Sequence, residues 1–330
     1  MNNTKNNPML SVFMITYNHE KYIKQALDGI LMQKVNFPYE IIIGDDCSQD
    51  NTQNILKEFK KKYPLKIKLL LHKENIGIKE NVNSVWRECS GKYIASCEGD
   101  DFWIDEYKLQ KQVQFLEKNP QYIGTTHKFQ IVDEKNKKID KELKHYFSGR
   151  IYNLSHAKDF LMPGQTATLV YRNILKDNFR NFELLENCEA NGDRKLSLFL
   201  SLFGEIYCFD EVMSAYRVIE THGDSWSAKT KGKNMILHRL NTFKELSYLA
   251  KEIKNVNINF KAQYLECGLT AFYILLTKPN KENLFVLKEV YKNTRHKKEM
   301  IFFICIKFSK KILTYCSKKI KKAIFIGKKI

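Results

Sequence analysis

The feature that most constrains the fold of this chain is a regular alternation of short apolar runs and segments with helical periodicity. Four continuous apolar runs occupy residues 10–15, 39–44, 67–71 and 93–97. The segments between them, at 20–32, 51–62 and 78–88, repeat their apolar residues at the spacing of an amphipathic helix. Strands that alternate with helices in this way predict a parallel sheet, and continuously apolar strands predict helices on both of its faces.

A polar cluster follows each of the four expected strands. The clusters are TYNHE at 16–20, DDCSQDNT at 45–52, HKENIG at 72–77 and EGDDFW at 98–103. Because ligands of open α/β sheets bind at the carboxyl ends of the strands, all four clusters are expected at one edge. The last cluster places three mutually repelling carboxylates, Glu98, Asp100 and Asp101, within four residues. Taken alone, it also fits an acidic loop that caps the helix expected to start near Lys108.

The order and spacing of the clusters resemble the family 2 glycosyltransferases of the GT-A fold. The matching residues are Thr16, Tyr17, Asn18, Asp45, Asp46, Ser48, Asp50, Asn75, Gly77, Glu98, Gly99, Asp100 and Asp101. Segments 191–217 and 222–227 look like the acceptor side of transferases for bacterial surface polysaccharide, such as capsule, O-antigen or exopolysaccharide. The resemblance covers about residues 9–228. It implies an α/β fold with a Rossmann-like, mostly parallel sheet flanked by helices, followed by a C-terminal helical extension.

The resemblance implies a divalent cation, Mn²⁺ or Mg²⁺, at the acidic cluster. Asp101 is the expected direct ligand, Glu98 and His222 are further candidates, and Asp100 is expected to touch the ribose or a water bound to the metal. These cations prefer oxygen ligands, and a cation offsets the charge that grows on a departing nucleoside diphosphate. Glu98 stands where the family often has Asp, which keeps the charge but lengthens the side chain. His222 also fits a solvated histidine in a polar loop.

The nucleotide-sugar is expected at the first three clusters, again by resemblance. Its expected contacts are Thr16, Tyr17, Asn18, Asp45, Asp46, Asn75, Gly77 and Asp100. The Tyr17 ring would stack on a pyrimidine, and Asp46 would accept the uracil N3–H. The alternatives are a half-packed Tyr17 and, for Asp45, Asp46 and Asp50, a turn followed by a helix cap. Gly77 is expected to permit either close backbone approach or a positive φ.

An inverting transfer also needs a base for the acceptor hydroxyl. Asp193 is the candidate, because it matches the G-D-x-x-L pattern of the family and precedes a helix-like run at 196–203. It would then project from the start of a helix, where an N-cap aspartate is the alternative or an additional role. Glu186 and Glu189 are nearby substitutes. Arg217 fits either a phosphate contact or an exposed strand end.

Positive charge is concentrated near the end of the chain. The net charge is +18, and the last 40 residues hold 13 Lys and Arg against one Glu, so they carry +12 of it. Apolar residues recur there at four-residue spacing, opposite most of the lysines; they are Phe308, Ile312, Cys316, Ile320 and Ile324. This pattern predicts a basic amphipathic helix on an anionic membrane surface, although a helix packed on the core or on a partner also fits. The expected divisions are a disordered segment at 1–8, a GT-A domain at 9–230, a helical region at 231–299 and the basic tail at 300–330.

The remaining features narrow the functional class. The eight cysteines form no C-x-x-C pair, the start of the chain lacks an apolar signal core, and the apolar stretch at 300–306 is shorter than the roughly 20 residues that span a bilayer. We therefore expect a cytoplasmic protein, peripheral on the inner face of the cell membrane, with a nucleotide-sugar donor such as a UDP-sugar and a glycan or lipid-linked acceptor. No nucleic-acid motif accompanies the charge, so nucleic acid is not an expected partner.

Two alternative functions remain open at this stage. One is a non-catalytic GT-A-fold binding or scaffold subunit of a polysaccharide assembly complex, which would be marked by loss of the carboxylates or the base. The other is a GT-A-like nucleotidyltransferase. Such an enzyme normally has a glycine-rich phosphate loop after the first strand, whereas TYNHEKY contains no glycine.

Overall fold

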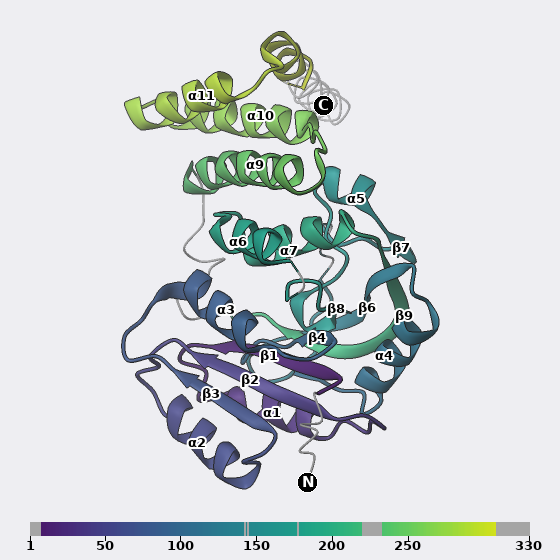
Figure 1. The fold of residues 1–330 in the computed structure, drawn as a ribbon. Coiled ribbons are helices and arrows are strands. Elements are labelled where there is room, and N and C mark those ends of the chain that lie inside the picture. The colour runs from purple at the N-terminus through teal and green to yellow at the C-terminus, as the bar shows by residue number, and fades with distance from the viewer. Residues whose placement is uncertain (1–7, 142, 144, 177, 220–232, 308–330) are drawn as a thin grey trace, which may run out of the picture. The chain divides into compact units, whose positions relative to one another are not determined.

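The computed structural model describes residues 8–141, 143, 145–176, 178–219 and 233–307, and its first four strands form a parallel half-sheet (Figure 1). These strands are β1 (Leu10–Thr16), β2 (Tyr39–Asp45), β3 (Ile67–Leu71) and β4 (Tyr93–Ser96). They pair in the spatial order β3-β2-β1-β4. Every residue of β1 and β4 is buried, so these apolar runs form the interior of the sheet as predicted.

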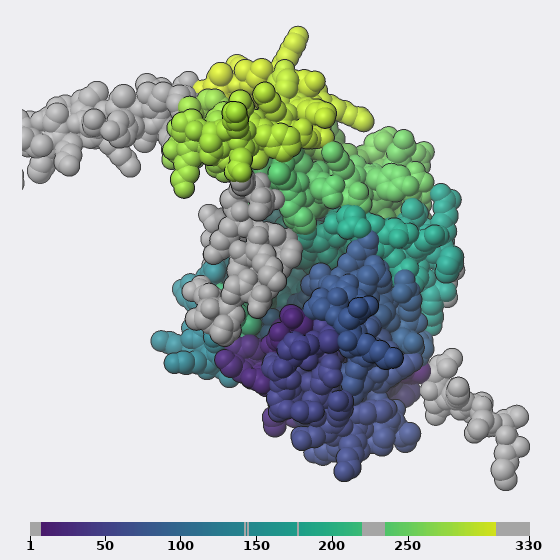
Figure 2. All heavy atoms as spheres, turned by 90° about the vertical axis from the view of Figure 1, so that its left-hand side faces the viewer, coloured from purple at the N-terminus to yellow at the C-terminus, as the bar shows by residue number. Residues whose placement is uncertain are grey.

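Helices cover both faces of this half-sheet. They are α1 (Ile23–Leu31), α2 (Thr52–Lys62) and α3 (Gly77–Glu88). Figure 1 shows α1 and α2 on one face and α3 on the other. Neighbouring residues of β1 point to opposite faces of the sheet. Met14 belongs to the core shared with α1, whereas the Phe13 ring lies 5.9 Å from the ring of Trp86 in α3. The purple and blue atoms of these strand–helix units form one continuous packed surface in Figure 2. This packing fixes the positions of the strand ends.

The second half of the sheet is mixed rather than parallel. Its strands are β5 (Phe102–Trp103), β6 (Tyr122–Val132), β7 (Ile151–Tyr152), β8 (Val170–Arg172) and β9 (Glu205–Arg217). The full order is β3-β2-β1-β4-β8-β6-β9-β5, with β7 also paired to β9. β8 is antiparallel to both β4 and β6, whereas β6 and β9 are parallel, with register shifts around Lys128. The helices of this half are α4 (Lys108–Lys118), α5 (Leu154–Lys158), α6 (Phe179–Asn187) and α7 (Gly192–Ser201), with a 3₁₀ turn at Thr166–Thr168.

The described chain divides into two compact units. The first contains the residues up to 219 and residues 245–258, and the second contains residues 233–244 and 259–307. The C-terminal helices are α9 (Lys233–Lys254), which contributes to both units, α10 (Lys261–Thr277), α11 (Lys281–Asn293) and a stretch at 297–307. Within the second unit, the rings of Phe243 and Phe260 stack at 5.2 Å.

None of the helices in the described part of the chain is both long enough and apolar enough to cross a membrane. The expected basic tail lies outside the described residues from position 308 onward, as does almost all of the expected disordered segment at 1–8. These two expectations therefore stay predictions.

Candidate active site

Three of the polar clusters meet at the carboxyl edge of the parallel strands. Thr16 and Asp45, the last residues of β1 and β2, are register partners. The Asp46 amide donates to the Thr16 carbonyl at 3.1 Å, and the Gly99 amide donates to the Ile15 carbonyl at 3.1 Å. The loops after β1, β2 and β4 therefore share one edge, as the pattern of strands predicts.

The loop after β1 is tied to the loop after β2. Asn18 has a φ of 55°, a left-handed conformation that asparagine tolerates better than most residues. Its amide donates to Ser48 Oγ at 2.9 Å, and its Oδ1 accepts from the Gln49 amide at 2.8 Å. Tyr17, just before it, keeps 38% of its surface exposed, so its ring lies at the edge and is not packed in the core.

The two aspartates after β2 have different environments. Asp45 is fully buried, and it accepts from the Ser48 hydroxyl at 2.5 Å and from Gln53 Nε2 at 2.6 Å, which supports its interpretation as a turn residue. Asp46 accepts from the Ile76 amide at 2.7 Å through Oδ1. No residue in the described part of the chain donates to its Oδ2, so Asp46 keeps an acceptor oxygen for a ligand.

The cluster at 72–77, which follows β3, joins the same edge through Asn75, whose Nδ2 donates to the Asp46 carbonyl at 3.2 Å. Gly77 begins α3 with a φ of 84°, and nothing lies within 4 Å of the position that a Cβ would take. Of the two reasons expected for this glycine, the structure shows the positive φ, and the close backbone approach stays a prediction.

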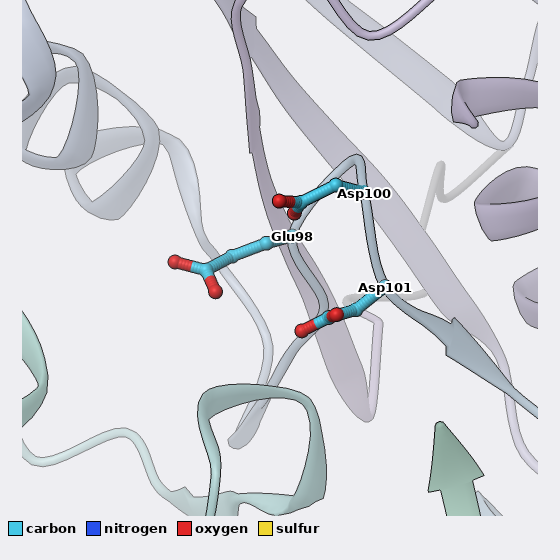
Figure 3. A group of neighbouring side chains, drawn as sticks. All are labelled: Glu98, Asp100 and Asp101. Carbon is cyan, nitrogen blue, oxygen red and sulfur yellow. The ribbon is translucent and has the colours of Figure 1, made fainter. Parts of the chain in front are cut away.

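The acidic residues after β4 lie together. Glu98, Asp100 and Asp101 project to the same side of the connection between β4 and β5 (Figure 3). One ligand oxygen from each lies within 4.8 Å of the other two. The N-cap of α4 is Tyr107, with no side-chain cap hydrogen bond, so these carboxylates do not cap the helix that starts at Lys108. Three carboxylates are the oxygen ligands that Mg²⁺ and Mn²⁺ prefer.

Burial and mutual repulsion change the protonation of this acidic cluster. Burial, followed by the charges of Asp100 and Asp193, raises the pKa of Glu98 to about 8. Burial, followed by the charges of Asp100 and Glu98, raises the pKa of Asp101 well above its usual value. The cluster therefore holds protons near neutral pH unless a positive charge compensates it. The residues present fit a divalent cation, which supplies such a charge.

Asp101 is held by two donors from distant parts of the chain. Its Oδ1 accepts from the Arg217 amide at 2.8 Å, and its Oδ2 accepts from Gln165 Nε2. Each carboxylate oxygen has a second lone pair, so Asp101 keeps the capacity to bind a cation. Arg217 is only 3% exposed, and its guanidinium donates to the Asp100 carbonyl and to Gln25 Oε1. The Arg217 side chain is thus not exposed at the end of its strand. Its hydrogen bonds instead hold the acidic loop in place.

Asp193 lies in the first turn of α7, whose N-cap is Asn191. Its side chain projects from the helix start as predicted, but it is not the cap. Asp193 is exposed, and its Oδ1 accepts a hydrogen bond from the adjacent Arg194 amide at 2.7 Å. Its charge contributes to the raised pKa of Glu98, which puts it within electrostatic range of the acidic cluster.

The two substitute bases are engaged in ion pairs with α3. Glu186 Oε1 lies 2.8 Å from Arg87 Nε, and Glu189 pairs with Lys79. Each of these two carboxylates is therefore already engaged by a cation of α3. Asp193 remains the candidate, because no cation in the described part of the chain forms an ion pair with it.

Several side chains at the site were not predicted. Gln165, described above, has no local sequence signal, because it reaches Asp101 only through the folded sheet. His19 Nε2 lies 4.0 Å from Asp100 Oδ2, and its position in the first polar cluster was a signal that the sequence offered.

Two tyrosines also feel the charge of the acidic cluster. Burial, followed by the charges of the site carboxylates, Asp101 among them, raises the pKa of both Tyr146 and Tyr216. His222 lies outside the described residues, so its role as a metal ligand stays a prediction.

The sequence profile of the family described as "Glycosyl transferase family 2" matches residues 11–179. The chain belongs to glycosyltransferase family 2. The matched region contains the whole parallel half-sheet and the acidic cluster, so the family relationship covers the proposed donor side of the site.

Relatives of this family 2 chain extend the match. "Uncharacterized protein Rv1520" of Mycobacterium tuberculosis is 34% identical over 227 residues, which cover 67% of this chain and 62% of that protein. The match thus spans less than two thirds of that relative's length. "Minor teichoic acid biosynthesis protein GgaB" of Bacillus subtilis is 27% identical over 74% of this chain and 27% of its own length.

A solved structure supports the fold of this family 2 chain. S. aureus TarS 1-349, in complex with UDP-GlcNAc, has a TM-score of 0.60 and 19% sequence identity, and the likeness covers 85% of this chain and 79% of that one. At this identity, the likeness concerns the fold alone. It confirms the expected GT-A arrangement of a sheet flanked by helices and followed by C-terminal helices. The sheet is mixed, whereas a mostly parallel sheet was expected.

Proposed function

We propose that this chain is an inverting, metal-dependent glycosyltransferase that moves a sugar from a nucleotide-sugar to a glycan or lipid-linked acceptor. The observation that carries the proposal is the meeting of Glu98, Asp100 and Asp101 at the carboxyl edge of the sheet, with two raised pKa values. Such a cluster is unfavourable without a positive partner, because each carboxylate disfavours ionisation of the others. A divalent cation, bound together with a nucleoside diphosphate, would supply the positive charge that the cluster requires.

Asp101 and Glu98 would hold Mn²⁺ or Mg²⁺, with His222 as a further candidate, and Asp100 would contact the ribose. When bound, the cation supplies charge stabilisation for the leaving diphosphate. Asp101 is already oriented by Gln165 and the Arg217 amide, so its ligand geometry is preorganised. Glu98 has the longer side chain and reaches the same space.

The nucleotide would lie against the loops after β1 and β2. The exposed Tyr17 ring would stack on the base, and Asp46 Oδ2 would accept a base N–H such as the uracil N3–H. The residues that would shape or contact this pocket are Thr16, Asn18, Asp45, Asn75 and Gly77. This chemistry favours a UDP-sugar as donor. The fold likeness to TarS, whose structure holds UDP-GlcNAc, makes that compound the first donor to test.

Asp193 would act as the general base. Direct displacement with inversion requires a carboxylate that takes the proton from the acceptor hydroxyl as it attacks. Asp193 is exposed at a helix start and within electrostatic range of Glu98. The paired carboxylates Glu186 and Glu189 are less suited to this role.

The acceptor would belong to bacterial surface polysaccharide synthesis. Support comes from the acceptor-side motif at 191–217 and from the similarity to GgaB, a minor teichoic acid biosynthesis protein. The enzyme would work in the cytoplasm, peripheral on the inner face of the membrane, with the basic tail at 300–330 against anionic lipid. A non-catalytic scaffold subunit is disfavoured because both the acidic cluster and Asp193 are present.

The experiment is a screen of nucleotide-sugars, beginning with UDP-GlcNAc and other UDP-sugars, for binding and slow hydrolysis with Mn²⁺ or Mg²⁺. We expect one donor to be hydrolysed, and we expect excess EDTA to stop the reaction. Hydrolysis that continues undiminished after all metal is removed would contradict the metal-dependent reaction. Release of a sugar 1-phosphate, through transfer of the nucleotidyl group, would instead indicate a nucleotidyltransferase.

A further inference from the structure

A hollow of about 200 Å³ lies in the first compact unit, apart from the acidic cluster. Its lining comes from β6, β9, the segment 146–150 and the pair Pro163–Gly164. None of the residues assigned above to the donor, the cation or the base lines it. The proposed reaction therefore leaves this hollow without a role.

One side of the hollow is aromatic. Phe129, Tyr146 and Phe147 line it, and the rings of Phe129 and Tyr146 meet edge to face at 5.1 Å. Each of the three is only partly buried, so ring surface remains for a ligand. Aromatic rings present broad apolar surfaces with defined orientation.

The other side of the hollow is charged. Asp210 forms an ion pair with Lys128, and the neighbouring Arg150 also contributes to the lowered pKa of Asp210. All three residues line the hollow and are exposed. They offer donors on Lys128 and Arg150 beside an acceptor on Asp210.

The hollow lies a short distance along the sheet from the acidic cluster. Gly164 lines it, and the next residue, Gln165, donates to Asp101. On β9, Val212 lines it five residues before Arg217, whose amide also donates to Asp101. Five residues of a strand span about 17 Å, at about 3.3 Å per residue. This end of the hollow is too far from the acidic cluster for the reacting sugar. Tyr146 and Gly164 bring the other end close to the cluster, so the hollow suits a neighbouring part of the same acceptor.

We propose that this hollow is a saccharide subsite, which holds a sugar unit of the acceptor glycan at a distance from the unit that receives the new sugar. The proposal rests on the proposed glycosyl transfer. The apolar C–H face of a sugar ring would pack on Phe129 and Tyr146. Its hydroxyl groups both donate and accept, so they would bond to Arg150 and Asp210 together. The enzyme would therefore favour an extended acceptor over a single sugar.

Asp210 favours a neutral saccharide over an anion in this hollow. A phosphate would be attracted by Lys128 and Arg150 but repelled by the Asp210 carboxylate near them. Lys128 is moreover already paired with Asp210. A hydroxyl-rich ligand satisfies the donors and the acceptor at once, and ligand sites commonly combine aromatic lining with a few such polar groups.

The test uses the full-length protein on an array of neutral mono-, di- and trisaccharides, in the presence of UDP and Mn²⁺. We expect the wild type to bind at least one di- or trisaccharide more tightly than its component monosaccharides. Arg150→Ala and Asp210→Asn should each weaken this binding about tenfold, the usual effect of losing a hydrogen bond to a charged group. The matched control is Asp28→Asn, because Asp28 is also an exposed aspartate paired with a lysine, Lys24.

Equal binding by the wild type and both hollow variants would overturn the proposal, and so would the absence of any saccharide binding by the wild type. Displacement of the saccharide by inorganic phosphate would indicate an anion site and would also overturn it. Binding of UDP-GlcNAc is measured in parallel on the same samples. Donor hydrolysis without saccharide binding would contradict the subsite but leave the proposed function standing. Saccharide binding that depends on Asp210, without activity on any donor, would contradict the proposed function but leave a saccharide site standing.

Discussion

Asp101 shows how a single buried carboxylate is oriented by residues that are far away in the chain. Its two hydrogen-bond donors, Gln165 and the Arg217 amide, are 64 and 116 residues away in sequence. The Arg217 side chain also holds the Asp100 carbonyl, so both aspartates are fixed to β9. Such outer contacts orient ligand oxygens before a cation binds, and loss of one typically costs about 10–100-fold in metal affinity.

Asp101→Asn should remove cation binding and leave the fold intact. Asparagine keeps the size of the side chain and one oxygen for the Arg217 amide, but it loses the charge and one ligand oxygen. Because loss of an outer partner alone costs about 10–100-fold in metal affinity, we expect Mn²⁺ affinity to fall by more than about 100-fold. Titration calorimetry with Mn²⁺ measures this, with Asp28→Asn as the control. Unchanged affinity in Asp101→Asn would exclude Asp101 as a ligand.

Asp193→Asn should retain donor binding and lose most of the transfer activity. The amide has nearly the same shape but cannot accept the acceptor's proton, and general acid–base catalysis contributes about 10²–10⁴-fold to rate. Steady-state kinetics should therefore show a fall in kcat of this size, with UDP-GlcNAc affinity unchanged. Glu189→Gln is the matched control, because that carboxylate is paired with Lys79. A kcat near that of the wild type in Asp193→Asn would move the base to Glu186 or Glu189.

At the scale of elements, the two halves of the sheet differ in how far the sequence predicts them. β1 to β4 were predictable because each is a continuous apolar run between helices, and such runs form strands buried on both faces. β5 and β7 have two residues each and β8 has three, so they carry no readable periodicity. The antiparallel direction of β8 follows from pairing with β4 and β6, and that pairing has no local signal.

The residues of the candidate site also differ in predictability according to which half of the sheet positions them. Glu98, Asp100 and Asp101 were predictable, because each follows a strand whose position the apolar runs reveal. Gln165 and Tyr146 were not predictable, because they approach the cluster only through the second half of the sheet. Sequence analysis therefore finds the donor side of such a site more completely than the side where the acceptor would bind.

Helix α4 begins with a buried lysine that should make stability depend on pH. Lys108 is fully buried, its Nζ has no hydrogen-bond partner among the described residues, and it lies 4.2 Å from the centre of the Trp103 ring. Burial lowers the pKa of Lys108 from 10.5 to about 7, although the nearby Cys97 and Asp105 act in the opposite direction. Between these two values the unfolded chain binds a proton that the folded protein does not, so stability should rise with pH across this range.

Lys108→Met should therefore stabilise the protein and remove this slope. Each pKa unit corresponds to about 1.4 kcal/mol, so we expect a gain of a few kcal/mol near pH 7 that shrinks toward pH 10. Urea unfolding near pH 7 and near pH 9 measures both quantities, with Lys57→Met as the exposed control. A destabilised Lys108→Met variant would mean that the ammonium has a stabilising partner when the protein is folded.

At the scale of the whole molecule, the charge is unevenly distributed. The last 40 residues carry +12 of the net +18. The described part of this segment, which ends at Lys307, exposes apolar side chains: Ile301 is 52% exposed and Phe302 is 68% exposed. Met300 and Ile304, by contrast, are buried within the second unit, where Met300 lies against Gly268. A truncation that tests the tail should therefore leave residues 300–307 in place.

Truncation after Lys307 should release the protein from anionic membranes. It removes residues 308–330, which contain eight lysines and no acidic residue. Each lysine near an anionic surface contributes on the order of 1 kcal/mol, screened by salt, and burial of apolar side chains adds about 25 cal/mol per Å². High salt should therefore release the full-length protein only in part, whereas truncation should release it fully.

Co-sedimentation with anionic and with neutral vesicles measures the effect of this truncation. The control replaces two exposed lysines of α2, Lys57 and Lys61, with glutamine, which lowers the net charge but keeps the tail. Transfer to a soluble acceptor should survive the truncation, because every proposed site residue lies before position 230. Equal binding of full-length and truncated protein to anionic vesicles would contradict a membrane role for the tail. It would favour a tail that packs on the protein itself or on a partner.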